Sequence, residues 1–238
     1  MPGEGPFLAF SHPPSCAQNV EARPTLFVND PYPFRVNEDC LYLNIFTPAV
    51  SSRGVLPVIV FLHGGNFQTG SSNEWPGHVL ASRGIVVVSV NYRLGAFGFL
   101  GFGDTKTGNY GLQDQRTALQ FVQDHIASFG GNPRQVTLVG HDAGAVNLFH
   151  AAAAMSGAEV SYHSTIGKPA LAFNNTIKLG RYLGCTQAVA DHVWDCIMTR
   201  STNDIIQALH TIPVRFLSYR KIRGLRMQYE FAQDIRFT

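Results

Sequence analysis

The chain has 238 residues, which is enough for one domain of ordinary to large size. Hydrophobic residues make up 45% and charged residues only 14%, which fits a large buried core and excludes a disordered tail or a coiled coil. The net charge of +2 requires neither a nucleic acid nor a membrane surface as partner. No apolar stretch reaches the roughly 18 residues that cross a bilayer, and residues 1–10 lack the pattern of a signal peptide.

The first predicted elements are strands. Every second residue from Leu41 to Ile45 is apolar, which predicts a strand with one buried face over residues 41–46. Residues 58–62 and 85–88 are continuous apolar runs. Such runs are typical of strands that helices bury on both faces, so both patterns predict a sheet inside a layered domain.

The middle of the chain predicts a helix, a strand and a second helical stretch. The first helix is indicated by apolar residues at steps of three and four: Leu119, Val122, Ile126 and Phe129. Residues 130–133, with two glycines and a proline, should end it. Residues 136–139 form a short apolar run, and an alanine-rich stretch follows residues 140–144. Strands that alternate with helices indicate an α/β class with a largely parallel sheet.

The pattern weakens beyond residue 156. Residues 201–204 have the residue types of a capping box, which predicts a helix that begins there and runs through Leu209. Basic residues gather between Arg215 and Arg226. We interpret these five charges as a solvated surface and not as a nucleic-acid site.

The cysteines Cys16, Cys40, Cys185 and Cys196 allow three pairings. Local pairing of Cys16 with Cys40 and of Cys185 with Cys196 would close two loops, and four buried thiols of a cytosolic protein are the alternative. No cysteine pair or histidine cluster has a metal-ligand spacing, so neither a metal nor a cofactor is predicted. Asn174 begins a sequon that would permit glycosylation of a secreted chain.

Two glycine-rich turns carry the chemical information. Asp142 stands in a Gly-x-Asp-x-Gly segment between a predicted strand and a helix, where a residue occupies the strained turn called a nucleophile elbow. Residues 63–67 follow an earlier strand and contain two glycines, which let backbone N–H groups approach an oxyanion closely. With the N–H group of Ala143 they would form an oxyanion hole.

Four further segments resemble the signatures of the type-B carboxylesterase/cholinesterase family. They are residues 38–44, 91–100, 108–115 and 129–133. The resemblance is close from about residue 13 to about residue 146 and looser from residue 155 to residue 209. It implies that residues 1–238 are a single incomplete α/β-hydrolase domain without the family's N-terminal strands and C-terminal part.

The resemblance also implies roles for individual residues. The oxyanion donors would be the N–H groups of Gly65, Asn66 and Ala143. Arg93 and Asp114 match a structural ion pair, which we expect to form because an unpaired buried charge is costly. The cysteines would form two local disulfides, Cys16–Cys40 and Cys185–Cys196.

The sequence departs from the family at the nucleophile. Asp142 stands where the family's enzymes have serine, and attack by its carboxylate on an ester would give an anhydride. We expect its negative charge to lie beside the oxyanion hole. The family's catalytic acid and histidine lie at positions beyond residue 238, and none of the nine histidines fills that role. His63 and His141 are predicted to be structural.

Two other departures concern the regions around the predicted site. The stretch 144–155 is shorter than the family pattern and would leave a helix of barely two turns. The loop between Cys16 and Cys40 contains no tryptophan, although cholinesterases carry one there as a cation–π platform for choline. Its absence indicates that choline esters are not substrates.

Together these features predict a catalytically inactive carboxylesterase-like domain, similar to the neuroligin and gliotactin branch, which acts in adhesion. The expected partner is another cell-surface protein, the expected location of the full-length protein is extracellular or cell-surface, and a homodimer is expected only of the full-length protein. One alternative is an active hydrolase of the carboxylesterase family. Another is an aspartate-nucleophile enzyme, because residues 140–144 are similar to the elbow of haloalkane dehalogenases and epoxide hydrolases. The last alternative is a non-functional fragment.

Overall fold

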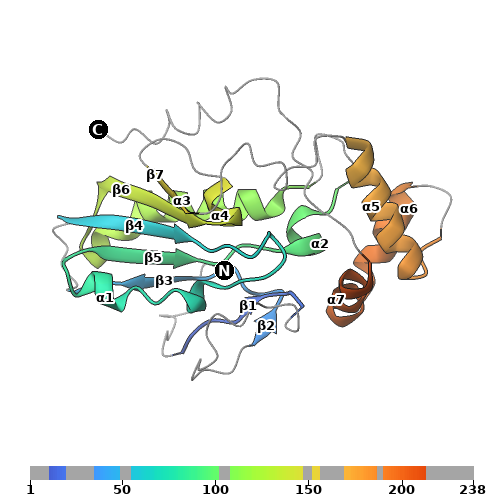
Figure 1. The fold of residues 1–238 in the computed structure, drawn as a ribbon, viewed down its shortest axis with the longest axis horizontal. Coiled ribbons are helices and arrows are strands. Elements are labelled where there is room, and N and C mark those ends of the chain that lie inside the picture. Colours follow the sequence, from blue (N-terminus) through green and yellow to red (C-terminus); the bar gives the residue numbers. More distant parts are fainter. Residues whose placement is uncertain are drawn as a thin grey trace, which may run out of the picture.

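The computed structural model describes residues 11–19, 35–48, 55–101, 108–146, 152–155, 169–186 and 190–212. Its main element is a five-stranded sheet with the strand order β3-β5-β4-β6-β7 (Figure 1). The strands are β3 (Leu43–Phe46), β4 (Leu56–Leu62), β5 (Val86–Val90), β6 (Gly131–His141) and β7 (Ala152–Met155). Strands β4 to β7 are parallel, and β3 pairs with β5 in the antiparallel direction. The α/β class predicted from the sequence is confirmed.

The continuous apolar runs form the centre of the sheet, as predicted. Val60 and Val88 pair across β4 and β5, and both are 0% exposed. The strand predicted over residues 41–46 begins two residues later than expected. The N–H group of Tyr42 donates to the carbonyl oxygen of Cys40 in a local turn, and Leu41 is 52% exposed, so the strand pairing starts at β3.

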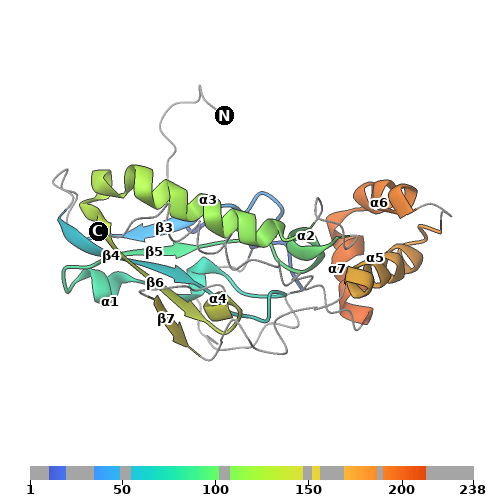
Figure 2. The same cartoon turned by 90° about the horizontal axis from the view of Figure 1, so that it is seen from above.

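The helix predicted in the middle of the chain is α3 (Tyr110–His125), which continues into a short 3-10 turn, Ile126–Phe129. Val122 and Ile126 pack against β4 and β5 in a core of buried aliphatic residues. Gly130 ends the turn with a φ of 85°, so it acts as the expected cap. Figure 2 shows α3 along one side of the sheet and the short helix α1 (His78–Ala81) on the other.

Four helices gather beyond one end of the sheet in both views (Figures 1 and 2). They are α2 (Gly95–Phe99), α5 (Pro169–Tyr182), α6 (Ala190–Met198) and α7 (Thr202–Thr211). The predicted start of α7 is confirmed, because the Ser201 hydroxyl accepts a hydrogen bond from the N–H group of Asp204. These helices share a second core, which includes the buried Leu94, Leu179 and Ile197.

The alanine-rich stretch after the elbow differs from its prediction. We expected a helix of barely two turns, but the described part of this stretch holds only the single turn α4 (Ala143–Val146) and then β7. The backbone of β7 pairs with Leu138–His141 of β6, and the N–H group of Asp142 donates to the carbonyl oxygen of Met155 over 2.7 Å. Pairing with the sheet therefore overrides the high helix propensity of alanine.

The predicted basic segment between Arg215 and Arg226 lies outside the described residues. Within the described part of the chain, the longest helix is α3, with 16 residues. None of the described helices combines the length and apolarity that crossing a membrane requires.

Candidate functional site

The first half of the site is the turn between β6 and α4. Asp142 has a φ of 48°, in the left-handed region that non-glycine residues adopt at a cost of about 1–3 kcal/mol. A Cβ atom on Gly140 would lie 2.4 Å from the carbonyl oxygen of Gly144, and one on Gly144 would lie 2.2 Å from the carbonyl oxygen of Leu62. Only glycine fits this close backbone approach, so the glycine spacing produces the sharp elbow that it predicts.

The second half is the loop of residues 63–70 after β4. Its consecutive residues Gly65, Asn66 and Phe67 have φ values of 108°, 54° and 59°. These three positive φ values turn the backbone sharply directly after His63 and Gly64. Within the loop the N–H group of Thr69 donates to the carbonyl oxygen of Gly65, and the Phe67 ring attaches the loop to α2 by packing edge-on against Phe99.

The two halves meet at the Asp142 side chain. The N–H groups of Gly65 and Asn66 both donate to its Oδ2 atom, over 3.0 and 2.8 Å. Burial alone raises the pKa of this carboxyl, but hydrogen bonds from the N–H groups of Asn66, Gly65 and Ala143 and the nearby His141 outweigh burial and hold the pKa below its usual value. Asp142 is therefore an ionised carboxylate on the three donors that the sequence assigned to an oxyanion hole.

This arrangement differs in one respect from the sequence-based expectation. We expected the negative charge of Asp142 beside the oxyanion hole, whereas its Oδ2 atom accepts hydrogen bonds from the donors themselves. In a serine hydrolase these donors stabilise the oxyanion of the reacting ester. Here a side chain of the chain itself occupies the same position.

Two histidines lie near the elbow, and both have packing contacts. His63 is 1% exposed and stacks on Tyr92 with 4.4 Å between ring centroids. Burial lowers the pKa of His63 to about 4, although its hydrogen bond to the carbonyl oxygen of Gly64 acts in the opposite direction. The His141 ring lies beside the Trp75 ring, with 5.5 Å between the ring centroids. His63 is thus a neutral core residue at pH 7, which fits the structural role expected from the sequence.

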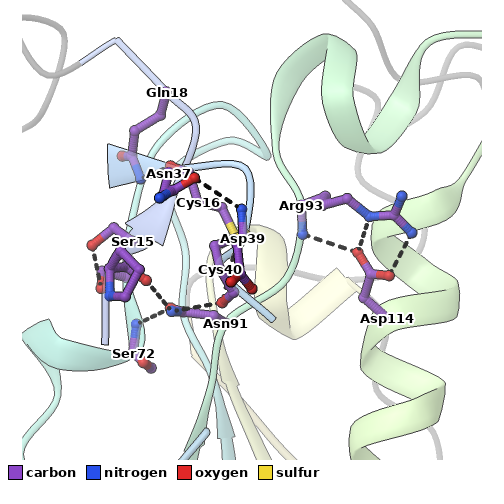
Figure 3. The surroundings of a disulfide bond; sticks show 12 residues. Ser15, Cys16, Gln18, Asn37, Asp39, Cys40, Ser72, Asn91, Arg93 and Asp114 are labelled. Atoms are coloured by element: carbon purple, nitrogen blue, oxygen red, sulfur yellow. Dashed lines mark hydrogen bonds and ion pairs between the residues drawn. A yellow bond between two sulfur atoms is a disulfide. The ribbon is translucent and has the colours of Figure 1, made fainter. Parts of the chain in front are cut away.

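The predicted ion pair between Arg93 and Asp114 is present in the structure (Figure 3). The guanidinium donates through Nη2 over 2.6 Å to one carboxylate oxygen and through Nε over 2.8 Å to the other, and the backbone N–H group of Arg93 adds a third hydrogen bond of 3.1 Å. Side-chain hydrogen bonding to Asp114 raises the pKa of Arg93. The pair joins the segment after β5 to α3, beside the elements that carry the site.

Both local disulfides are present, and the structure contains no free cysteine. Cys16–Cys40 closes a loop of 24 residues and Cys185–Cys196 a loop of 11. Each member of the first pair is at most 2% exposed. Cys16 belongs to the short strand β1 (Ser15–Cys16), which pairs in parallel with β2 (Val36–Asn37), and Cys40 follows β2 (Figure 3). Paired cysteines fit an oxidising compartment better than the cytosol.

The first disulfide is connected to the site through Gln18, which the sequence analysis missed. Its side chain donates to the carbonyl oxygens of Cys16 and Gly70 and accepts from the N–H group of Gly70. The other cysteine of this disulfide also has a side-chain partner, because Asn91 donates to the carbonyl oxygen of Cys40 (Figure 3). A single buried glutamine has no periodic pattern, so no sequence signal marks this anchor of the 63–70 loop.

The predicted glycosylation site lies in α5. Asn174 is exposed, whereas Thr176 of the same sequon is 0% exposed and donates a hydrogen bond to the carbonyl oxygen of Gly101. Glycan attachment at Asn174 therefore stays a prediction. Among the residues that the structure describes, no group of three or more His, Cys, Asp and Glu side chains is placed to hold a metal ion.

A mostly parallel sheet, with an elbow after one strand and a donor loop after its neighbour, defines the α/β-hydrolase class. The chain belongs to the carboxylesterase family, whose model matches residues 2–229. This agrees with the family resemblance seen in the sequence.

Individual relatives carry names of both enzymes and a neuroligin-like protein. The chain is 65% identical over 233 residues to Neuroligin-like protein glit-1 of Caenorhabditis elegans, covering 92% of this chain and 32% of that protein. It is 36% identical to Carboxylesterase 1D of Rattus norvegicus (83% of this chain, 38% of that protein) and 39% identical to Acetylcholinesterase of Electrophorus electricus (84% and 35%). The chain thus spans about a third of the length of these relatives.

Proposed function

We propose that this chain is part of a carboxylesterase-like domain that does not hydrolyse esters and that serves as a protein-interaction module at the cell surface. The observation that carries the proposal is the pair of hydrogen bonds from Gly65 and Asn66 to Oδ2 of Asp142. They place a negative charge where ester hydrolysis would require stabilisation of a second negative charge.

The chemistry of the side chain supports the loss of turnover. Carboxylate attack on an ester carbonyl would form an anhydride in place of the acyl-enzyme that a serine forms. The N–H groups of Gly65 and Asn66 stabilise the ionised carboxylate before any substrate arrives, which lowers its reactivity further. The residues at the elbow keep the turn geometry of a hydrolase while the group that performs the reaction is replaced.

The location and partner class rest on other observations. The relative with 65% identity is named as a neuroligin-like protein, and two disulfides fit an extracellular environment. A fold whose reactive group is replaced can still present its surface to another protein. The proposed partner is therefore another cell-surface protein, with no nucleic acid and no cofactor.

The proposal is tested with the 238-residue chain and with the full-length protein. We expect no covalent labelling by a fluorophosphonate probe and no hydrolysis of p-nitrophenyl acetate above buffer, with rat Carboxylesterase 1D as the positive control. Antibody staining of unpermeabilised cells that express the full-length protein should be positive. Stoichiometric labelling by the probe would contradict the loss of catalysis, and staining only after permeabilisation would contradict the location.

A second candidate is an aspartate-nucleophile hydrolase, because Asp142 is ionised and sits at an elbow. In that reaction a carboxylate oxygen attacks an sp³ carbon, the halide or the epoxide oxygen leaves, and water hydrolyses the resulting alkyl ester with the help of a histidine. His63 is buried and neutral, which favours the first proposal. Release of halide from 1-bromobutane by the full-length protein, lost in Asp142→Asn, would support the second candidate.

A further inference from the structure

We propose that the disulfide Cys185–Cys196 is a thiol-exchange site, at which a small thiol such as glutathione attacks the sulfur of Cys196 and opens the bond while Cys16–Cys40 stays closed. This exchange lies outside the proposed function, because it concerns the helices α5 and α6 and not the elbow. It makes no use of the loss of ester hydrolysis, so either proposal can fail while the other holds.

The two disulfides differ in their access to solvent. Cys16 and Cys40 are 2% and 0% exposed. In the second pair Cys185 is 1% exposed, whereas Cys196 of α6 is half-buried. The Nη2 atom of the exposed Arg200 donates to the sulfur of Cys196 over 3.6 Å, so this sulfur lies at the edge of the core. A thiolate from solution therefore reaches Cys196 first.

The Arg200 guanidinium brings a positive charge to this sulfur. Its Nη2 atom also lies 3.8 Å from the position that a Cβ atom on Gly184 would take, one residue before Cys185. A guanidinium near a cysteine attracts an incoming thiolate and favours the thiolate form of the cysteine itself. Arg200 should therefore assist both the attack on Cys196 and its later release.

Two molecules of thiol balance the exchange. The first glutathione thiolate forms a new S–S bond with Cys196, the bond between the two cysteine sulfurs breaks, and its electron pair leaves on Cys185, which takes a proton from water. A second glutathione thiolate attacks the glutathione sulfur of the mixed disulfide, and the Cys196 thiolate leaves. Glutathione is oxidised to its disulfide, and the protein disulfide is reduced to two thiols.

The helices beside the disulfide have contacts that do not depend on it. Val193 and Ile197 of α6 are 3% and 1% exposed, in the core that they share with Leu179 of α5. Thr176 anchors α5 as well, because its hydroxyl donates to the carbonyl oxygen of Gly101 over 2.8 Å. The opened form should therefore keep both helices, while the covalent link between the end of α5 and α6 is released.

Two serine variants separate the two sulfurs. Cys185→Ser and Cys196→Ser break the same disulfide and leave one thiol each, so each is the matched control of the other. Both are incubated with oxidised glutathione without denaturant, and the mixed disulfide is followed by mass spectrometry. Cys185→Ser should react at least about tenfold faster, because the thiol of Cys185 lies in the core and reacts only after local opening. Equal rates, or faster reaction of Cys196→Ser, would overturn the proposal.

The role of the guanidinium is tested in the Cys185→Ser background. Arg200→Ala should slow formation of the mixed disulfide by about threefold at pH 7. Arg200→Lys keeps a positive charge and should restore most of the rate, and Arg134→Ala, which removes an exposed arginine of β6, should leave it unchanged. An unchanged rate in Arg200→Ala would contradict this part of the proposal.

If the serine variants do not fold, the unmodified chain and the full-length protein still test the inference. Each is treated with increasing reduced glutathione without denaturant and quenched with iodoacetamide, and the alkylated cysteines are identified by mass spectrometry. Cys185 and Cys196 should be alkylated at concentrations at which Cys16 and Cys40 remain paired. Alkylation of all four cysteines together, of the first pair alone or of none would overturn the proposal.

Discussion

Asp114 and Asp142 are two carboxylates removed from bulk water in different ways. Asp114 faces a guanidinium, with a side chain 6% exposed and Arg93 at 2.6 Å. Asp142 is half-buried, and its Oδ2 atom accepts hydrogen bonds from the backbone N–H groups of Gly65 and Asn66, which carry no net charge. The first carboxylate therefore depends on one side chain, and the second on the conformation of a loop.

This difference determines which substitutions can disturb each carboxylate. A mutation can remove the partner of Asp114, since that partner is the side chain of Arg93. The donors to Oδ2 of Asp142 are main-chain N–H groups, which only a proline substitution would remove, so these contacts change mainly if the backbone moves or the carboxylate itself is replaced. Four predictions test this contrast, from the largest expected effect to the smallest.

Arg93→Ala should have the largest effect. Among the described residues, it leaves the buried Asp114 carboxylate with the N–H group of residue 93, at 3.1 Å, as its hydrogen-bond donor. Loss of one partner of a buried pair costs about 3 kcal/mol here, at the lower end of the usual range because Arg93 is 35% exposed. The Tm should fall by about 6–12 °C. Thermal unfolding checks this against Arg134→Ala, an exposed arginine, and equal Tm values would show that the pair contributes little.

Gly144→Ala should cause the second-largest loss of stability, because it disturbs the backbone that forms the elbow. The new Cβ atom would lie 2.2 Å from the carbonyl oxygen of Leu62, and relief requires β4 and the elbow to separate. A cost of about 2–3 kcal/mol follows from overpacking. The control is Gly84→Ala, where φ is 85° but no atom lies within 4 Å. Gly144 has no positive φ, so if urea denaturation gives Gly144→Ala no larger loss than Gly84→Ala, close packing does not require glycine at position 144.

Asp142→Asn should cost less than either, because the amide oxygen accepts the same two N–H groups. The loss is the difference between charged and neutral hydrogen bonds, about 1 kcal/mol, which lowers the Tm by about 2–4 °C. Asp124→Asn removes the same charge from an exposed face of α3 and serves as control. A loss as large as that of Arg93→Ala would break the distinction between the two carboxylates.

The smallest effect is a dependence on pH. The folded pKa of Asp142 lies below the ordinary value of 3.8, so ionised Asp142 stabilises the fold above that value, and this contribution is lost as the pH falls through the folded pKa. The difference in unfolding free energy between the unmodified chain and Asp142→Asn should be constant from about pH 5 to 8. It should shrink below about pH 4. A difference that grows on acidification would contradict the sign of the shift.

Much of the fold could be predicted because its signals are local. The apolar runs of β4 and β5, the periodic face of α3 and the cap at Ser201 each occupy a few consecutive residues. Strand β7 was missed because its alanines favour a helix, and the pairing with β6 that outweighs this preference is invisible in a local window.

The candidate site was predictable in its parts but not in its assembly. The glycine spacing indicated an elbow at Asp142 and donors at Gly65 and Asn66. The contact between them depends on the positive φ of Asn66 and on the approach of two strand ends, which no sequence pattern specifies. Similarly, the residues alone left three pairing patterns of the four cysteines open, and only the family resemblance selected the one pattern, with two disulfides, that the structure contains.

One aromatic contact gives the elbow an optical signal of its own. The Trp75 ring lies 4.5 Å from the ring of Phe61 and 5.5 Å from that of His141, the residue just before Asp142. The emission of an indole depends on the groups packed against it, so the fluorescence of Trp75 reports on its contact with the ring that adjoins the elbow. The sequence has only two tryptophans, and replacing Trp194 with phenylalanine would leave Trp75 as the sole emitter. Movements of this turn could then be followed in dilute solution, without labels.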